Sequence, residues 1–80
     1  MNLTAVEIQN IRNEYANEDF AILMESGYMA ITNTKHGLIC LEVENGEFKA
    51  DNGAGQVLMT TSNEQVIKDF IASSYVFAEA

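Results

Sequence analysis

The fold is decided by the stretch LICLEVENGEFKA, residues 38–50. Apolar and acidic side chains alternate over its LEVE segment, which is the pattern of a strand with one buried face and one solvent face. The dipeptide Asn45-Gly46 follows, and it favours a two-residue hairpin turn because both residues tolerate a positive φ. We therefore predict a hairpin of strands 38–44 and 47–50, with Leu41 and Val43 facing the core and the glutamates between them facing solvent.

Further strands are predicted on both sides of this hairpin. Short apolar runs bounded by glycine and polar residues indicate strands at 28–32 and 56–61, with Lys35-His36-Gly37 as a tight turn. Residues 20–24 are ambiguous. Their sequence fits a first strand, with Ser26-Gly27 as the following turn, and it equally fits a short helix that ends at Gly27.

A helix is predicted at each end of the chain. Thr4 and Glu7 have the spacing of a capping box, and the apolar stripe of Ala5, Ile8, Ile11 and Tyr15 extends this helix over residues 5–16. Ser62 and Gln65 repeat the capping-box spacing, and an apolar face follows, made by Val66, Ile67, Phe70 and Ile71. The last aromatic residues, Tyr75 and Phe77, fit either an extension of the second helix or a short apolar tail.

These elements predict one α+β domain over residues 1–80. It has an N-terminal helix, an antiparallel meander of four to five strands and a C-terminal helix, and both helices cover one face of the sheet. A chain of 80 residues is too short for a second independent core. This layout carries many unrelated functions, so function has to be argued from particular residues.

The charge balance is the most unusual property of the chain. Twelve Asp and Glu against four Lys and Arg give a net charge of −8. Such a surface repels phosphate backbones and anionic lipids and attracts basic proteins, so we expect no direct binding of nucleic acid or membrane. The chain has one cysteine, Cys40, and no leader or membrane-span pattern, so we expect a cytoplasmic protein.

No motif in the chain predicts catalysis, a cofactor or a metal site. Cys40 and His36 are four residues apart, but an acidic surrounding disfavours a reactive thiolate, so we interpret Cys40 as a packed thiol and His36 as a turn residue. Asp51-Asn52-Gly53 lacks the later carboxylate of a calcium loop, and Gly53-Ala54-Gly55 lacks the Lys-Ser/Thr of a phosphate loop. We therefore expect a protein that is not an enzyme.

The acidic hairpin is the first candidate for a partner-binding site. Its carboxylates are Glu42, Glu44, Glu47 and Asp51, and the aromatic tail residues Tyr75 and Phe77 are a second candidate surface. The leading hypothesis is an inhibitor or modulator of a basic, nucleic-acid-handling protein that mimics a nucleic-acid backbone, by analogy with small acidic anti-defence proteins of viruses and mobile elements. The alternative is a self-assembling interaction module that forms a homodimer through the tail or an edge strand.

Overall fold

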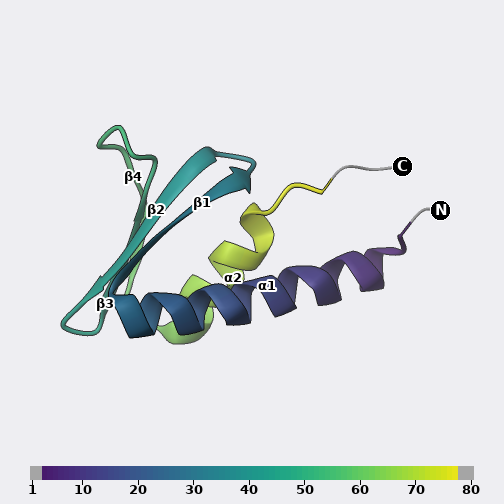
Figure 1. Ribbon diagram of the computed structural model, residues 1–80, viewed down its shortest axis with the longest axis horizontal. Helices are drawn as coiled ribbons and strands as arrows, with labels where there is room; N and C mark the ends of the chain where they lie inside the picture. The colour runs from purple at the N-terminus through teal and green to yellow at the C-terminus, as the bar shows by residue number, and fades with distance from the viewer. Residues whose placement is uncertain (1–2, 78–80) are drawn as a thin grey trace.

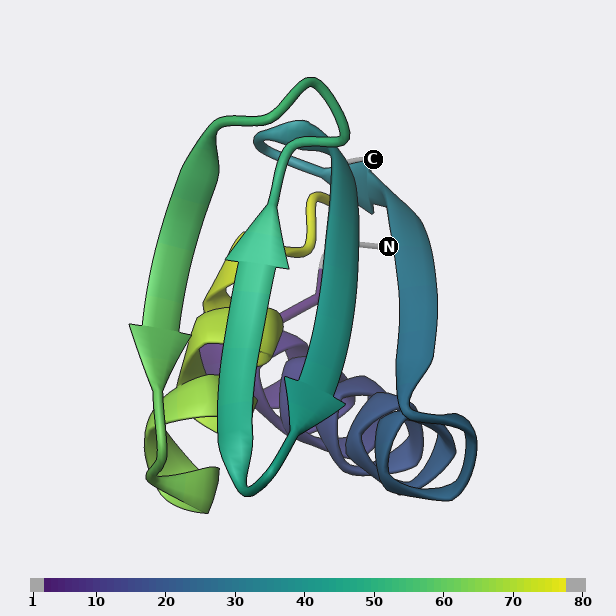
Figure 2. The ribbon, with the colours of Figure 1, turned by 90° about the vertical axis from the view of Figure 1, so that its left-hand side faces the viewer.

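The computed structural model describes residues 3–77 of the chain. The elements follow in the order α1 (Ala5–Ser26), β1 (Tyr28–Thr34), β2 (Gly37–Glu44), β3 (Glu47–Asp51), β4 (Val57–Thr61) and α2 (Glu64–Ser74). The strands form one antiparallel sheet in sequence order, β1-β2-β3-β4. Both helices lie on the same side of it (Figures 1 and 2). The predicted α+β class is confirmed, with four strands in the meander.

Helix α1 begins at the predicted residue, and its end lies ten residues beyond the predicted end. Thr4 caps it, because its hydroxyl accepts from the Glu7 amide at 3.1 Å and the Glu7 carboxylate accepts from the Thr4 amide at 3.0 Å. The helix continues through 22 residues to Gly27, whose φ of 79° is left-handed and whose amide donates to the Leu23 carbonyl at 2.7 Å. The strand predicted at 20–24 is therefore wrong. The helical alternative is confirmed in its type and in its end at Gly27, but these residues extend α1 and do not form a second short helix.

The buried stripe of α1 also differs from the predicted one. Ala16 and Leu23 are its buried residues, and Phe20 packs against the core between them. This 16-20-23 spacing is helical and links the predicted first helix to the ambiguous segment. Ala5 is exposed because the first turns of α1 extend past the sheet (Figure 1), and Tyr15 is exposed on the flank of the helix.

The central hairpin has the predicted geometry. Asn45 and Gly46 have φ values of 52° and 77°, as a two-residue turn of this type requires. Glu44 therefore lies opposite Glu47, and Leu41 lies opposite Ala50, with both of these apolar residues fully buried. The inner face of the sheet and the helices together form one core, to which the sheet and α2 contribute Ile31, Ile39, Leu41, Phe48, Ala50, Ile67, Ile71 and Ala72.

Helix α2 begins one residue later than predicted and is followed by an extended tail. Its N-cap is Asn63, whose side chain accepts from the amides of residues 65 and 66, so the capping box predicted at Ser62 is wrong. The helix ends at Ser74, and Tyr75 is extended and forms a β-bridge with Thr34 at the end of β1. The tail is therefore not a continuation of the helix.

Candidate functional site on the open face of the sheet

The candidate site is the face of the sheet that points away from the helices, which we call the open face. Among residues 3–77 no helix covers it, and it is turned towards the viewer in Figure 2. The alternation of the strands and their register give its side chains, which are Tyr28, Ala30, Thr32, Leu38, Cys40, Glu42, Glu44, Glu47, Lys49, Asp51, Val57 and Thr60. All of them are exposed or half-buried.

The strand register arranges these side chains in rows across the sheet. One row runs Tyr28, Glu42, Lys49, Thr60, and the next runs Ala30, Cys40, Asp51, Val57. Side chains opposite one another on neighbouring strands are about 5 Å apart at Cβ. The sheet therefore brings the four predicted carboxylates, which span ten residues of sequence, onto one continuous surface.

This surface keeps an excess of negative charge. Its four carboxylates are Glu42, Glu44, Glu47 and Asp51, and its one cation is Lys49, whose Nζ lies 2.8 Å from Glu42 Oε1. That hydrogen bond and the charge of Glu42 raise the pKa of Lys49, and Asp51 and Glu44 raise it further. The other three carboxylates of the open face form no ion pair with any residue of the described chain.

Tyr28 is an open-face residue that sequence reasoning missed. Its side chain is 56% exposed, and its hydroxyl donates to Cys40 Sγ at 3.7 Å. This hydrogen bond raises the pKa of Tyr28, and the carboxylates of Asp51 and Glu42 add to the effect. The alternation of strand 28–32 does predict that Tyr28 lies on the opposite face of the sheet from the buried Ile31. That Tyr28 lies beside the acidic residues follows only from the register between β1 and β2.

The loop between β3 and β4 closes one end of the open face. A Cβ on Gly53 would lie 2.8 Å from Leu38 Cδ2 and 3.7 Å from Cys40 Sγ, so the loop backbone rests against these two side chains. Asp51 Oδ1 accepts from the Gly53 amide at 2.8 Å, and Asn52 Oδ1 accepts from the Ala54 amide at 2.8 Å. These contacts are those of a polar turn, as predicted for this segment.

The aromatic tail lies elsewhere. Tyr75 packs edge-on against Tyr15 of α1, with ring centroids 5.4 Å apart, and stacks with Phe77 at 6.2 Å. Its hydroxyl donates to the Asp19 carboxylate. Burial raises the pKa of Asp19 in spite of this hydrogen bond, and burial together with Asp19 raises the pKa of Tyr75. The tail is therefore engaged with α1, and the structure does not bring it together with the four carboxylates.

Arg12 holds the tail in place. Its guanidinium donates to the carbonyl oxygens of Ala72, at 3.1 Å, and of Tyr75, and it lies 5.2 Å from the ring centroid of Phe77. Helix α2 has no basic residue in its last turn and no glycine at its C-cap. A cation from α1 thus supplies the C-terminal capping that α2 lacks.

Cys40 and His36 make separate contacts. The Cys40 thiol meets Tyr28 on the open face, whereas the His36 ring stacks on Phe70 of α2, with centroids 6.0 Å apart and an angle of 12° between the rings. Within residues 3–77, no three His, Cys, Asp or Glu side chains gather as a group that could hold a metal ion.

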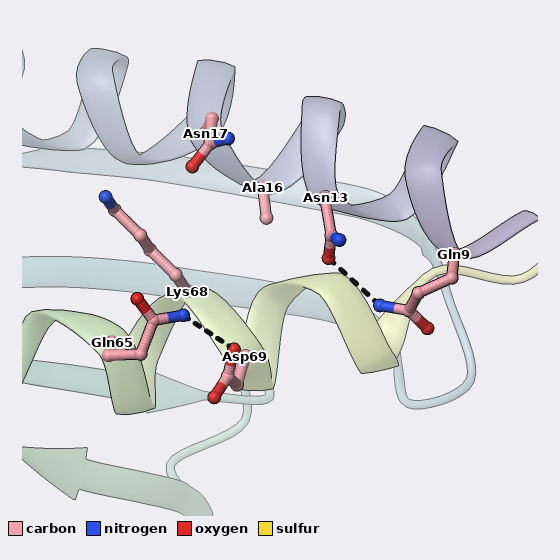
Figure 3. A pocket seen from close by; sticks show the side chains of 7 residues that line it. All are labelled: Gln9, Asn13, Ala16, Asn17, Gln65, Lys68 and Asp69. Carbon is pink, nitrogen blue, oxygen red and sulfur yellow. Dashed lines mark hydrogen bonds between the residues drawn. The ribbon is translucent and has the colours of Figure 1, made fainter. Parts of the chain in front are cut away.

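A polar hollow lies between the two helices (Figure 3). Its amide side chains bond along their own helices, Gln9 to Asn13 and Gln65 to Asp69, each at 2.9 Å. Lys68 Nζ lies 4.7 Å from the ring centroid of Phe20. Four of the polar side chains of the hollow therefore bond along their own helices and not across the hollow.

Two further observations bear on function. No helix in the described part of the chain has the length and apolar character needed to cross a membrane. A comparison of the chain with protein-family models, with curated proteins and with solved structures finds no match in any of the three.

Proposed function

We propose that this protein is a small acidic binding protein that inhibits or modulates a basic, nucleic-acid-handling protein, and that the open face is its binding surface. The observation that carries the proposal is the arrangement on that face of four carboxylates on β2 and β3, beside an exposed tyrosine on β1, with only one compensating lysine. The role is non-enzymatic. We place it in the cytoplasm, where the unpaired thiol of Cys40 stays reduced.

Charge supplies the first part of the argument. Uncompensated carboxylates attract a basic partner over a distance of about one Debye length, roughly 8 Å at physiological salt, and thereby raise the association rate. Glu42 and Glu44 project from the same face of β2 two residues apart, which corresponds to a spacing of about 7 Å along the strand. A groove that binds nucleic acid recognises negative charge repeated along a backbone, so this surface can compete for it.

The exposed apolar side chains supply the second part. Binding energy in protein interfaces is concentrated in a few central residues, with tyrosine among the commonest, while rim charges set rate and specificity. Tyr28 lies beside Glu42, and Leu38 and Val57 are 41% and 52% exposed at the other end of the face. We therefore assign Tyr28 as the anchor of the interface and the carboxylates as its rim.

The test compares two triple variants with the same net charge. Glu44→Gln, Glu47→Gln and Asp51→Asn neutralise the open face, and Glu14→Gln, Glu18→Gln and Glu25→Gln neutralise three exposed carboxylates of α1. Both change the net charge from −8 to −5, because each removes three negative charges. Each tagged variant is used to capture proteins from a lysate of the native organism or its host, with added DNA or raised salt as competitor.

The proposal expects the wild type and the α1 variant to capture a basic protein that DNA and salt release, and the open-face variant to lose it. With the captured protein purified, Tyr28→Ala should weaken binding at least tenfold, because truncation of an interface anchor costs about 2 kcal/mol or more. Equal capture of the basic protein by both triple variants would show that the open face is not the binding surface. Retention of the partner in excess DNA would contradict mimicry of a nucleic-acid backbone.

A further inference from the structure

We infer that β4 is a pairing edge, through which two copies of this chain join their sheets into one antiparallel sheet of eight strands. The inference does not depend on the proposed partner. It rests on the two edges of the sheet, of which one binds the tail at its end and the other has no neighbour among residues 3–77, and on the absence of charged side chains from β4.

The tail occupies the end of the β1 edge, at residues 33–35. Beyond the bridge between Thr34 and Tyr75, the Lys35 amide donates to the Ser74 carbonyl at 2.8 Å and the Val76 amide donates to the Asn33 carbonyl at 3.2 Å. A strand added along β1 would have to displace these contacts. The β4 edge has no such cover, because β4 pairs only with β3 among residues 3–77 and no element lies beyond it in Figure 2.

The hydrogen-bonding direction along β4 follows from the central hairpin. In a two-residue hairpin the flanking residues, here Glu44 and Glu47, exchange both backbone hydrogen bonds, and such pairs then alternate along the ladder. Phe48 therefore directs its backbone groups towards β4, where its partner is Thr61. Thr60, the next residue along β4, directs its N–H and C=O away from β3 and into solvent.

Charge identifies a second copy as the occupant. The chain carries a net charge of −8, yet residues 52–63, which include all of β4, contain no charged side chain. Edge strands in natural sheets are commonly protected from pairing by lysine, proline or other charges, and this strand, VLMTT, has none of these. The nearest open-face charges are Lys49 opposite Thr60 and Asp51 opposite Val57, one of each sign. Two copies that pair along β4 therefore bring no charged side chain of the pairing strands into contact.

A two-fold axis perpendicular to the sheet pairs β4 with β4 in antiparallel order. Such an interface is self-complementary, as a homodimer requires. It places both helical layers on one side and both open faces on the other. The dimer would thus present a single acidic surface of twice the width.

The first test measures the molecular mass in solution by light scattering, over a series of dilutions. The wild type should have about twice the chain mass of 8.8 kDa at high micromolar concentration and the chain mass on dilution. Thr60→Pro removes an outward N–H, a change that edge strands accept, and should keep the chain mass at every concentration. The control is Thr60→Val, which retains the N–H and should dimerise like the wild type.

Hydrogen exchange of the wild-type protein provides a test without substitution. The Thr60 amide should exchange slowly in the dimer and rapidly on dilution, while the amides of Met59 and Thr61 stay protected by β3 at both concentrations. A monomeric wild type whose Thr60 amide exchanges rapidly at high concentration would overturn the inference. A dimer that Thr60→Pro and Thr60→Lys both leave intact, with the fold verified by circular dichroism, would place the interface elsewhere and overturn it as well.

Discussion

Replacing Arg12 by methionine should destabilise the protein by about 2–3 kcal/mol. The methionine keeps most of the apolar stem and removes the guanidinium, which bonds two carbonyl oxygens at the end of α2 and lies over the Phe77 ring. Hydrogen bonds from charged donors contribute about 1.5–3 kcal/mol each when buried, and a cation over an exposed ring about 0.5–1 kcal/mol. Because Arg12 is only half-buried, solvent screens these interactions, and we take about 1 kcal/mol for each hydrogen bond and about 0.5 kcal/mol for the ring contact.

This loss is large for a chain of this size. At about 0.05–0.15 kcal/mol per residue, a domain of 80 residues has a total stability of about 4–12 kcal/mol. The assay is equilibrium unfolding in urea, followed by far-ultraviolet circular dichroism. With a urea dependence of about 1–2 kcal/mol per molar for a small domain, the midpoint should fall by about 1–3 M.

Lys35→Met is the matched control. Lys35 is exposed in the turn between β1 and β2, and its loss changes the net charge by the same amount. It should change stability by no more than about 0.5 kcal/mol. Arg12→Lys, which keeps the charge but not the two-pronged donor, should recover part of the loss. If Arg12→Met and Lys35→Met unfold at the same urea concentration, the guanidinium does not hold the tail, and the capping argument is refuted.

Three other perturbations test the description of the fold. Gly53→Ala and Gly55→Ala should each destabilise by about 1 kcal/mol in urea unfolding, since both glycines have positive φ. The added Cβ at residue 53 would also lie 2.8 Å from Leu38 Cδ2, but this is the free end of an exposed side chain that can turn aside, so the two losses should be similar; a much larger loss at residue 53 would show that Leu38 cannot move. Asn63→Ala should cost about 1 kcal/mol as an N-cap is lost, and an unchanged unfolding midpoint would argue against this cap. Hydrogen bonds to the capping threonine hold the pKa of Glu7 below its ordinary value. The stabilisation from these bonds is therefore complete above the ordinary pKa and is lost as the pH falls through the lowered pKa. An NMR titration of the Glu7 carboxyl checks the direction of the shift, and Glu7→Gln, which keeps the hydrogen bonds but does not titrate, should remove this pH dependence.

Local signals in the sequence were enough to predict most of the sheet. The turn at Asn45-Gly46 and the alternation before it set the register of β2 and β3, and both belong to adjacent residues. The capping box at Thr4 is local in the same way. The start of α1 and the central hairpin were therefore predictable from the chain alone.

The remaining elements depend on contacts between distant residues. Residues 20–24 satisfy both a strand and a helix pattern, and the choice is made by the packing of Phe20 on Phe48, whose ring centroids are 5.6 Å apart. The extended tail is selected by Arg12 and by the end of β1, which lie 40 residues or more before it in the chain. Sequence reasoning had no access to these pairings.

The candidate site was also predictable only in part from the sequence. The acidity of the hairpin was visible in the sequence, because Glu42, Glu44 and Glu47 lie within six residues. The position of Tyr28 beside Glu42 was not visible, because it depends on the register between β1 and β2. The pairing of Tyr75 with Asp19, 56 residues apart, was equally hidden.

The contact of Arg12 with Ala72 and Tyr75 also bears on how the protein is made. Synthesis proceeds from the N-terminus, so α1 emerges before the sheet, and the residues that its guanidinium binds emerge after it. The three hairpins of the meander join neighbouring segments and can form as they emerge, but the inner face of their sheet stays uncovered until α2 follows. The final packing therefore waits until α2 has been synthesised. A nascent chain that stalls before residue 64 would expose Ile39, Leu41 and Phe48 to solvent, and would be a substrate for chaperones or proteases.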